Sequence, residues 1–81
     1  MVDLRLKERN KEKIIYRYYP NGKEDFGEIS YSFETKEVVV EKVCKGESIE
    51  RYSMCRSFAK RAIERFAENN EFPEYKMVAW G

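Results

Sequence analysis

Residues 48–70 read SIERYSMCRSFAKRAIERFAENN, and this stretch decides the fold. Its apolar residues recur every three or four positions, the spacing that returns a side chain to the same side of an α-helix. They are Tyr52, Cys55, Phe58, Ala59, Ala62, Ile63 and Phe66. The spacing predicts one amphipathic helix, whose apolar stripe needs an apolar surface to cover it.

Signals at both ends bound this helix. The Ser48 hydroxyl can accept a hydrogen bond from an unpaired amide of the first turn, and Glu50 suits the positive end of the helix dipole. The pair Asn69-Asn70 can supply a left-handed stop, and Pro73 cannot continue a helix. We therefore expect the helix to run from Ser48 to Asn70.

Before the helix, apolar and polar residues alternate with the period of two that is typical of strands. The predicted strands are 2–7, 13–19, 27–33 and 37–44, and a frayed arm is the alternative for the first of them. Turns are expected at 8–12, at Pro20-Asn21-Gly22 and at 34–36. The side chains predicted to face the helix are Ile14, Tyr16, Tyr18, Ile29, Tyr31, Phe33, Val38 and Val40.

The tail 75–80 is short, apolar and aromatic, and predicts a last strand. It can lie at the far edge of the sheet, antiparallel to the first strand, or directly beside the strand that precedes the helix, parallel to it. Either placement gives an α+β fold, an antiparallel meander of order ββββαβ with one helix on one face. We expect residues 1–81 to form a single domain.

The composition argues against several partners. Sixteen basic and fifteen acidic residues leave a formal net charge of +1, whereas phosphate-binding modules usually show a clear basic excess. There is no run of about 20 apolar residues that would cross a membrane and no secretory signal. Two cysteines, Cys44 and Cys55, are too few for a disulfide framework. We expect a cytoplasmic protein with no membrane partner.

The residue types also limit the chemistry. The chain has no histidine, so it cannot hold a Ser-His-Asp or Cys-His catalytic set, and its cysteines make no zinc-ligand set. Its four glycines form no phosphate-binding pattern. Asp25 and Glu28 flank Gly27, where a solvated hairpin end is the simpler interpretation than an acid pair. We expect no enzyme activity, no metal and no cofactor.

Two features predict binding. On the face away from the helix, a patch of Ile15, Tyr19, Val39 and Val43 would suit a homodimer or another protein partner. On the helix, four basic residues could contact nucleic acid, although Glu64 and Glu68 interrupt them. They are Arg56, Lys60, Arg61 and Arg65. The leading hypothesis is a non-enzymatic interaction domain, and the alternative is a nucleic-acid-binding module.

Both features also have a purely structural interpretation. The outer tyrosines would simply show their hydroxyl groups to water, and the basic residues would belong to a solvated helix face with mixed ion pairs. Two stretches, YYPNGKEDFGEISYSFET from residue 18 and FPEYKMVAWG from residue 72, with the helix between them, resemble small single-domain bacterial proteins of uncharacterised function. The resemblance implies the same strand–strand–helix–strand order and transfers no site residue.

Overall fold

The computed structural model describes residues 1–21, 24–44 and 50–79, and for residues 50–53 it describes the backbone alone. The elements are β1 (Val2–Arg9), β2 (Lys13–Pro20), β3 (Gly27–Ser32), β4 (Val38–Lys42), α1 (Glu50–Asn69) and β5 (Tyr75–Val78). The predicted α+β order ββββαβ is confirmed, and the first segment is a strand rather than a frayed arm.

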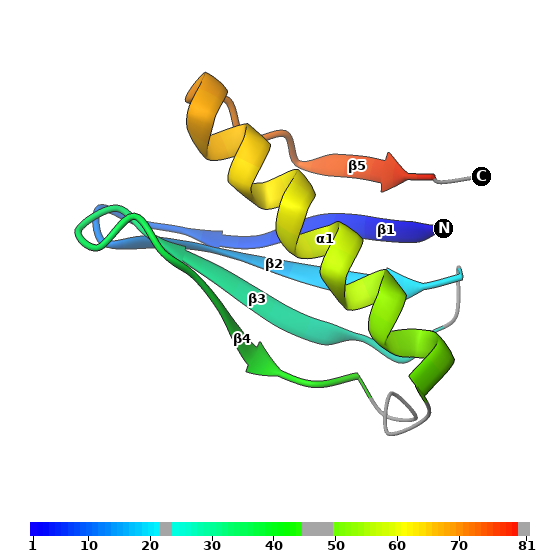
Figure 1. The fold of residues 1–81 in the computed structure, drawn as a ribbon. Coiled ribbons are helices and arrows are strands. Elements are labelled where there is room, and N and C mark those ends of the chain that lie inside the picture. Colours follow the sequence, from blue (N-terminus) through cyan, green and yellow to red (C-terminus); the bar gives the residue numbers. More distant parts are fainter. Residues whose placement is uncertain (22–23, 45–49, 80–81) are drawn as a thin grey trace.

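The five strands form one antiparallel sheet in the order β4-β3-β2-β1-β5, and α1 crosses one face of it diagonally (Figure 1). The last strand lies at the far edge, where Val78 pairs with Val2 and Lys76 with Leu4. Of the two placements left open by the sequence, the parallel one beside β4 is therefore wrong.

β1 runs two residues further than predicted, so Glu8 and Arg9 belong to a strand and not to a turn. A bulge between Leu6 and Glu8 shifts the register by one residue. The alternation of apolar and polar residues is therefore broken at this point, and a strict period of two does not predict that the strand continues. The turn that follows is built by Asn10, whose side-chain oxygen accepts hydrogen bonds from the amides of Glu12 and Lys13 at 2.8 and 2.9 Å.

β3 and β4 are shorter than predicted, ending at Ser32 and Lys42. The turn between them closes through the Lys36 amide, which donates to the Ser32 carbonyl at 2.8 Å, and Lys36 takes a φ of 60°. Beyond β4 the chain leaves the sheet, and the Cys44 amide donates to the Tyr18 hydroxyl at 3.2 Å.

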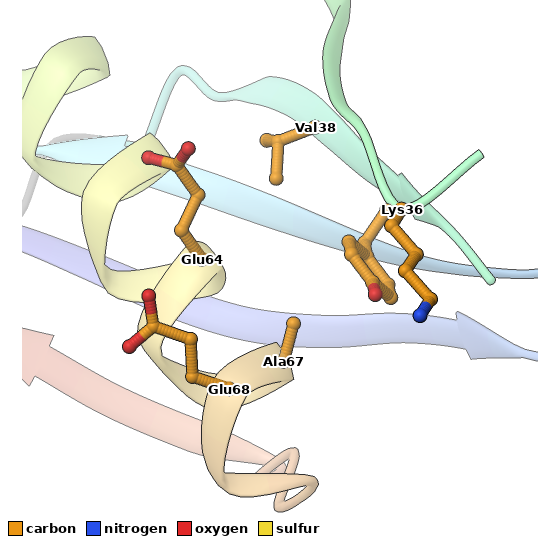
Figure 2. Close-up of a pocket in the computed structure, with 6 residues that line it drawn as sticks. Lys36, Val38, Glu64, Ala67 and Glu68 are labelled. Carbon is orange, nitrogen blue, oxygen red and sulfur yellow. The ribbon is translucent and has the colours of Figure 1, made fainter.

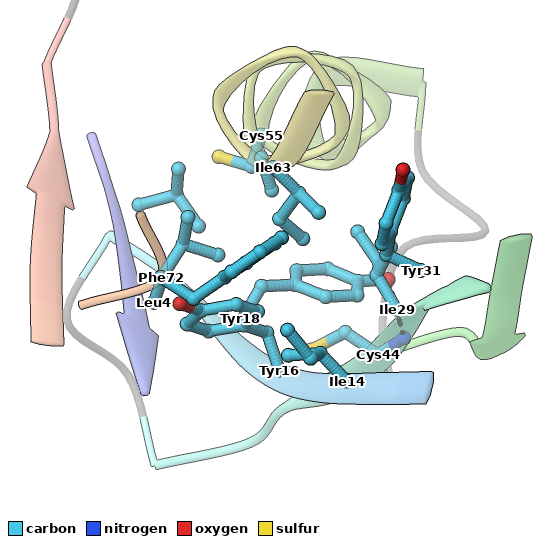
Figure 3. Packing of buried hydrophobic residues seen from close by; sticks show 12 residues of the cluster. Leu4, Ile14, Tyr16, Tyr18, Ile29, Tyr31, Cys44, Cys55, Ile63 and Phe72 are labelled. Carbon is cyan, nitrogen blue, oxygen red and sulfur yellow. Dashed lines mark hydrogen bonds between the residues drawn. The ribbon is translucent and has the colours of Figure 1, made fainter. Parts of the chain in front are cut away.

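The core fills the layer between the sheet and α1 (Figure 3). The inward residues predicted for β2, Ile14, Tyr16 and Tyr18, are all fully buried, as is Ile63 of α1. Each buried side chain of this size contributes roughly 1.5–3 kcal/mol by leaving water. The predicted apolar stripe of α1 and the predicted inward side chains of β2 therefore pack against each other in one core.

α1 ends at Asn69, one residue before the predicted end, and Asn70 supplies the predicted left-handed stop. Asn70 takes a φ of 51°, its amide donates to the Ala67 carbonyl, and the Glu71 amide donates to the Phe66 carbonyl. These two bonds form the Schellman arrangement, which satisfies carbonyls that the helix leaves unpaired. Ser48, the predicted N-cap, and Trp80 of the predicted tail lie outside the described residues. Within the described ranges, no helix is long and apolar enough to cross a membrane.

Candidate functional site

The sheet face away from α1 carries a row of five side chains that the strand register aligns from edge to edge. Arg5 pairs with Tyr75 and with Arg17, and Glu28 pairs with Arg17 and with Lys42. We call this the cross-sheet row: Tyr75, Arg5, Arg17, Glu28 and Lys42. It places aromatic and basic groups on the β1–β5 side and a carboxylate on the β3 side.

Glu28 is the ionised anchor of this row. Its Oε2 accepts a hydrogen bond from Lys7 Nζ at 2.9 Å and lies 3.7 Å from Arg17 Nε. The hydrogen bond from Lys7 lowers the pKa of Glu28, and the charges of Arg17 and Lys42 act in the same direction. A carboxylate held by cations stays ionised, so Glu28 serves in this row as the ion-pair partner of Lys7 and Arg17.

Aromatic rings on this face lie against cations. The Arg5 guanidinium is 5.5 Å from the ring centre of Tyr19 and 5.7 Å from that of Tyr75. Arg17 and Lys42 lie 4.5 and 4.4 Å from the ring of Phe26. These cation–π contacts hold long basic side chains in place, so the face presents an ordered array of rings and charges.

Tyr75 is tied to its neighbour across the β1–β5 pair. Its hydroxyl donates to Asp3 Oδ1 at 3.2 Å, and its ring remains half exposed. Loss of water around the hydroxyl and the adjacent Asp3 carboxylate raise the pKa of Tyr75. At neutral pH the Tyr75 side chain is thus uncharged, and its hydrogen bond to Asp3 orients a ring that is available for contact at the edge of the sheet.

The four residues of the predicted patch do not form one apolar surface. Ile15 is only 9% exposed, and Tyr19 is partly buried, against Phe26 and Arg5. Val39 is 47% exposed on β4, and Val43, 50% exposed, lies past the end of that strand. The centre of the face is polar.

The polarity of that centre comes from a hydrogen-bonded pair. Ser30 pairs in register with both Ile15 and Val39, and its hydroxyl donates to Glu41 Oε1 at 2.7 Å. The exposed apolar groups of the sheet therefore lie toward its edges. Besides Val39 they include Tyr75 and Met77, both half exposed. Side chains of a strand alternate between the two faces of a sheet, so with Val78 facing the helix, Tyr75 and Met77 could have been assigned to the outer face from the sequence.

The four basic residues of α1 fall into two rows. Arg56 and Lys60 are spaced by four, and the same row continues through Glu64 and Glu68. Arg61 and Arg65 belong to another row, on the side of the helix that faces β5. The structure therefore brings Arg61 and Arg65 together and places the other two with acidic residues.

A groove of about 290 Å³ runs between α1 and the edge strand β5. Its apolar wall consists of Phe58, Ala62, Phe66, Val78 and Ala79, and its charged residues are Arg61, Arg65 and Lys76. The Arg61 guanidinium lies 5.9 Å from the centre of the Phe58 ring. We call this the α1–β5 groove; among the described residues, its lining holds three cations and no carboxylate.

The other flank of α1 has the opposite charge. A hollow of about 340 Å³ lies between the helix and the β3–β4 side. Figure 2 shows Glu64 and Glu68 on the helix and Lys36 across from them. Val38 and Ala67 lie between the two sides. The helix thus separates an acidic flank from a basic one.

Both thiols are buried: Cys44 is 5% and Cys55 2% exposed. The Cys55 thiol donates to the Met1 carbonyl at 3.7 Å. Among the residues that the structure describes, no three histidine, cysteine, aspartate or glutamate side chains are grouped closely enough to hold a metal ion.

The chain matches no protein-family model, no curated protein and no solved structure. The function is therefore inferred from two surfaces of the molecule, the outer sheet face with its cross-sheet row and the α1–β5 groove.

Proposed function

We propose that this protein is a non-enzymatic interaction domain that pairs with a second copy of itself through the outer sheet face. The observation that carries the proposal is the cross-sheet row, in which Arg5 and Glu28 lie one strand to either side of the central strand β2. A twofold axis along β2 sets Glu28 of one copy over Arg5 of the other. Two Glu28–Arg5 contacts then form, as the symmetry of an isologous contact requires. The same axis sets the two Arg17 side chains opposite each other, and the Glu28 carboxylate 3.7 Å from each Arg17 Nε offsets that like charge.

The same axis brings the two exposed edges together. β4 of one copy lies over β5 of the other, so Val39 and Tyr75, each about half exposed in the single chain, both lie in the contact, about two residues apart along the strands. Lys42 of one copy faces the ring of Tyr75 in the other, a further cation–π contact. Apolar edges around a polar centre make this a contact of moderate affinity.

Size and net charge favour such pairing. A formal charge of +1 provides little repulsion between copies. A chain of 81 residues also leaves a large share of its surface exposed, which association reduces.

Sedimentation equilibrium over a concentration series tests the proposal. We expect reversible dimers for the natural chain and mainly monomers for both Val39→Glu and Tyr75→Lys, since each places a charge in an apolar contact. Mixing the two variants should restore part of the pairing, because the new glutamate and the new lysine then place opposite charges on the two facing edges. Dimerisation that neither variant weakens, or a natural chain that stays monomeric at millimolar concentration, would overturn the proposal.

Met54→Glu is the matched control. Met54 is 52% exposed on α1, away from the outer face, so this variant adds the same charge at the same exposure. It should dimerise like the natural chain. If it is equally impaired, added charge alone explains the loss and the outer face is not the contact.

Nucleic acid is the competing ligand for the basic residues of α1. The positions of the four residues argue against nucleic acid. Arg56 and Lys60 lie on one row of α1 and Arg61 and Arg65 on another, whereas contact with a phosphate backbone would need all four on one face. The absorbance ratio at 260 and 280 nm of the purified protein tests it. Co-purified nucleic acid that is released by high salt would favour this alternative.

A further inference from the structure

We propose that the α1–β5 groove binds an extended acidic segment of a protein partner, which adds to the sheet as a strand beside β5. The segment would carry an apolar side chain and a carboxylate two residues apart. This site lies on the helix side of the sheet and is independent of the pairing proposed for the outer face.

The charge of the groove selects the partner. Arg61 and Arg65 come from α1 and Lys76 from β5, and none of the carboxylates that the structure describes lines the space between them. The neighbouring flank of the same helix carries Glu64 and Glu68. A basic or neutral segment would gain nothing from the groove cations, whereas a carboxylate would pair with them.

The edge strand supplies the means of attachment. β5 pairs with β1 on one side, and none of the described strands pairs with its other side. Free backbone amides and carbonyls of an edge strand are a template for an added strand. The backbone of the four residues of β5, Tyr75–Val78, can form hydrogen bonds with the segment, and the groove can receive the side chains of the segment.

The register predicts the motif. Lys76 and Val78 pair with the inward residues Leu4 and Val2, so both point to the helix side of the sheet. An added strand alternates in the same way, and its inward side chains lie beside Lys76 and Val78. A carboxylate beside Lys76 and an apolar group beside Val78 are two residues apart, within reach of Phe58.

A second copy of this chain is a poor occupant. Pairing two β5 edges would bring Arg61, Arg65 and Lys76 of both copies to one seam, and like charges there oppose association. A lysine on an edge strand commonly prevents such self-pairing. The groove therefore accepts an acidic strand and rejects its own.

The probe is a fluorescent peptide, Thr-Val-Thr-Glu-Thr-Val-Thr-Glu-Thr, titrated by anisotropy. We expect saturable binding that weakens roughly tenfold or more in the double variant Arg61→Glu with Arg65→Glu, because two attractive contacts become repulsive. The double variant Arg56→Glu with Lys60→Glu, on the other helix row, is the matched control with the same change of charge, and it should change the dissociation constant less than about twofold. Equal losses in both would show general charge attraction and overturn the proposal.

Three further outcomes separate a strand in the groove from other ligands. Two N-methylated peptides should behave differently, one methylated at the odd-numbered residues and one at the even-numbered residues. Only alternate amides face β5, so one of the two peptides should lose binding and the other should keep it. A scrambled peptide of the same composition that binds equally well would contradict the motif. Displacement of the peptide by an oligonucleotide or by dodecanoate at lower concentration would assign the groove to another class of ligand.

Discussion

The Tyr16 hydroxyl ties the centre of the sheet to the segment between α1 and β5. It donates to the Pro73 carbonyl at 2.6 Å, and the Tyr16 side chain is fully buried. Burial disfavours the charged phenolate and raises the pKa of Tyr16 to about 12, from an ordinary 10.0. One side chain thus joins β2 to the approach of the last strand.

Tyr16→Phe should lower the free energy of unfolding by about 1 kcal/mol at neutral pH, the net worth of one hydrogen bond. Because the pKa is raised in the folded state, the stability that the neutral phenol contributes is complete below about pH 10. It is lost as the pH rises toward about 12. The difference between the natural chain and the variant should therefore shrink over that range in urea titrations, and a constant difference would contradict this account.

Residue types explain why some contacts were predictable and others were not. The alternation of β2 correctly assigns Tyr16 and Tyr18 to the core, because a period of two depends on the backbone alone. Ile15 was expected on an exposed patch, yet it is buried. Exposure on an outer face depends on the size of neighbouring side chains from other strands, which no local pattern contains.

At the scale of elements, the C-terminal end of α1 depends on Asn70. Its φ of 51° is left-handed, and this conformation allows the amides of Asn70 and Glu71 to reach back to the last helical turn. Asparagine tolerates the conformation better than most residues, and glycine better still.

Asn70→Gly should therefore raise the free energy of unfolding by roughly 0.5 kcal/mol, and Asn70→Val should lower it by about 1 kcal/mol or more. Asn69→Gly is the matched control, because Asn69 is the last residue of α1 and has no positive φ. It should destabilise by up to ~1 kcal/mol. Thermal unfolding followed by circular dichroism distinguishes the three, and stabilisation by Asn69→Gly would argue against the cap.

At the scale of the whole molecule, the two described ends of the chain lie side by side. Val2 of β1 pairs with Val78 of β5, and the Met1 carbonyl accepts a hydrogen bond from the Asn21 amide at 2.8 Å (Figure 1). A linker between the ends would convert β5 and β1 into a hairpin. The meander would then be continuous in the chain as it already is in space.

A circular permutant tests this arrangement. Joining the ends through about four added Gly and Ser residues, and opening the chain at Thr35 in the exposed turn before β4, should give a cooperatively folded protein. We expect its stability to lie within about 2 kcal/mol of the natural chain, since loop closure depends weakly on length. A near-ultraviolet spectrum without tertiary signal would contradict the expectation that the fold tolerates this linker and this opening.

The sequence by itself determined the element order, which side chains of β2 and β3 face the helix, and the end of α1 to within one residue. All of these follow from interactions within a few positions of the chain. Only the tertiary structure decided that β5 joins β1, that Arg61 and Arg65 share a groove with Lys76 while Arg56 and Lys60 do not, and that Glu28 anchors a row across the sheet. These depend on which distant segments meet, and a local period of two or of 3.6 residues does not encode that choice.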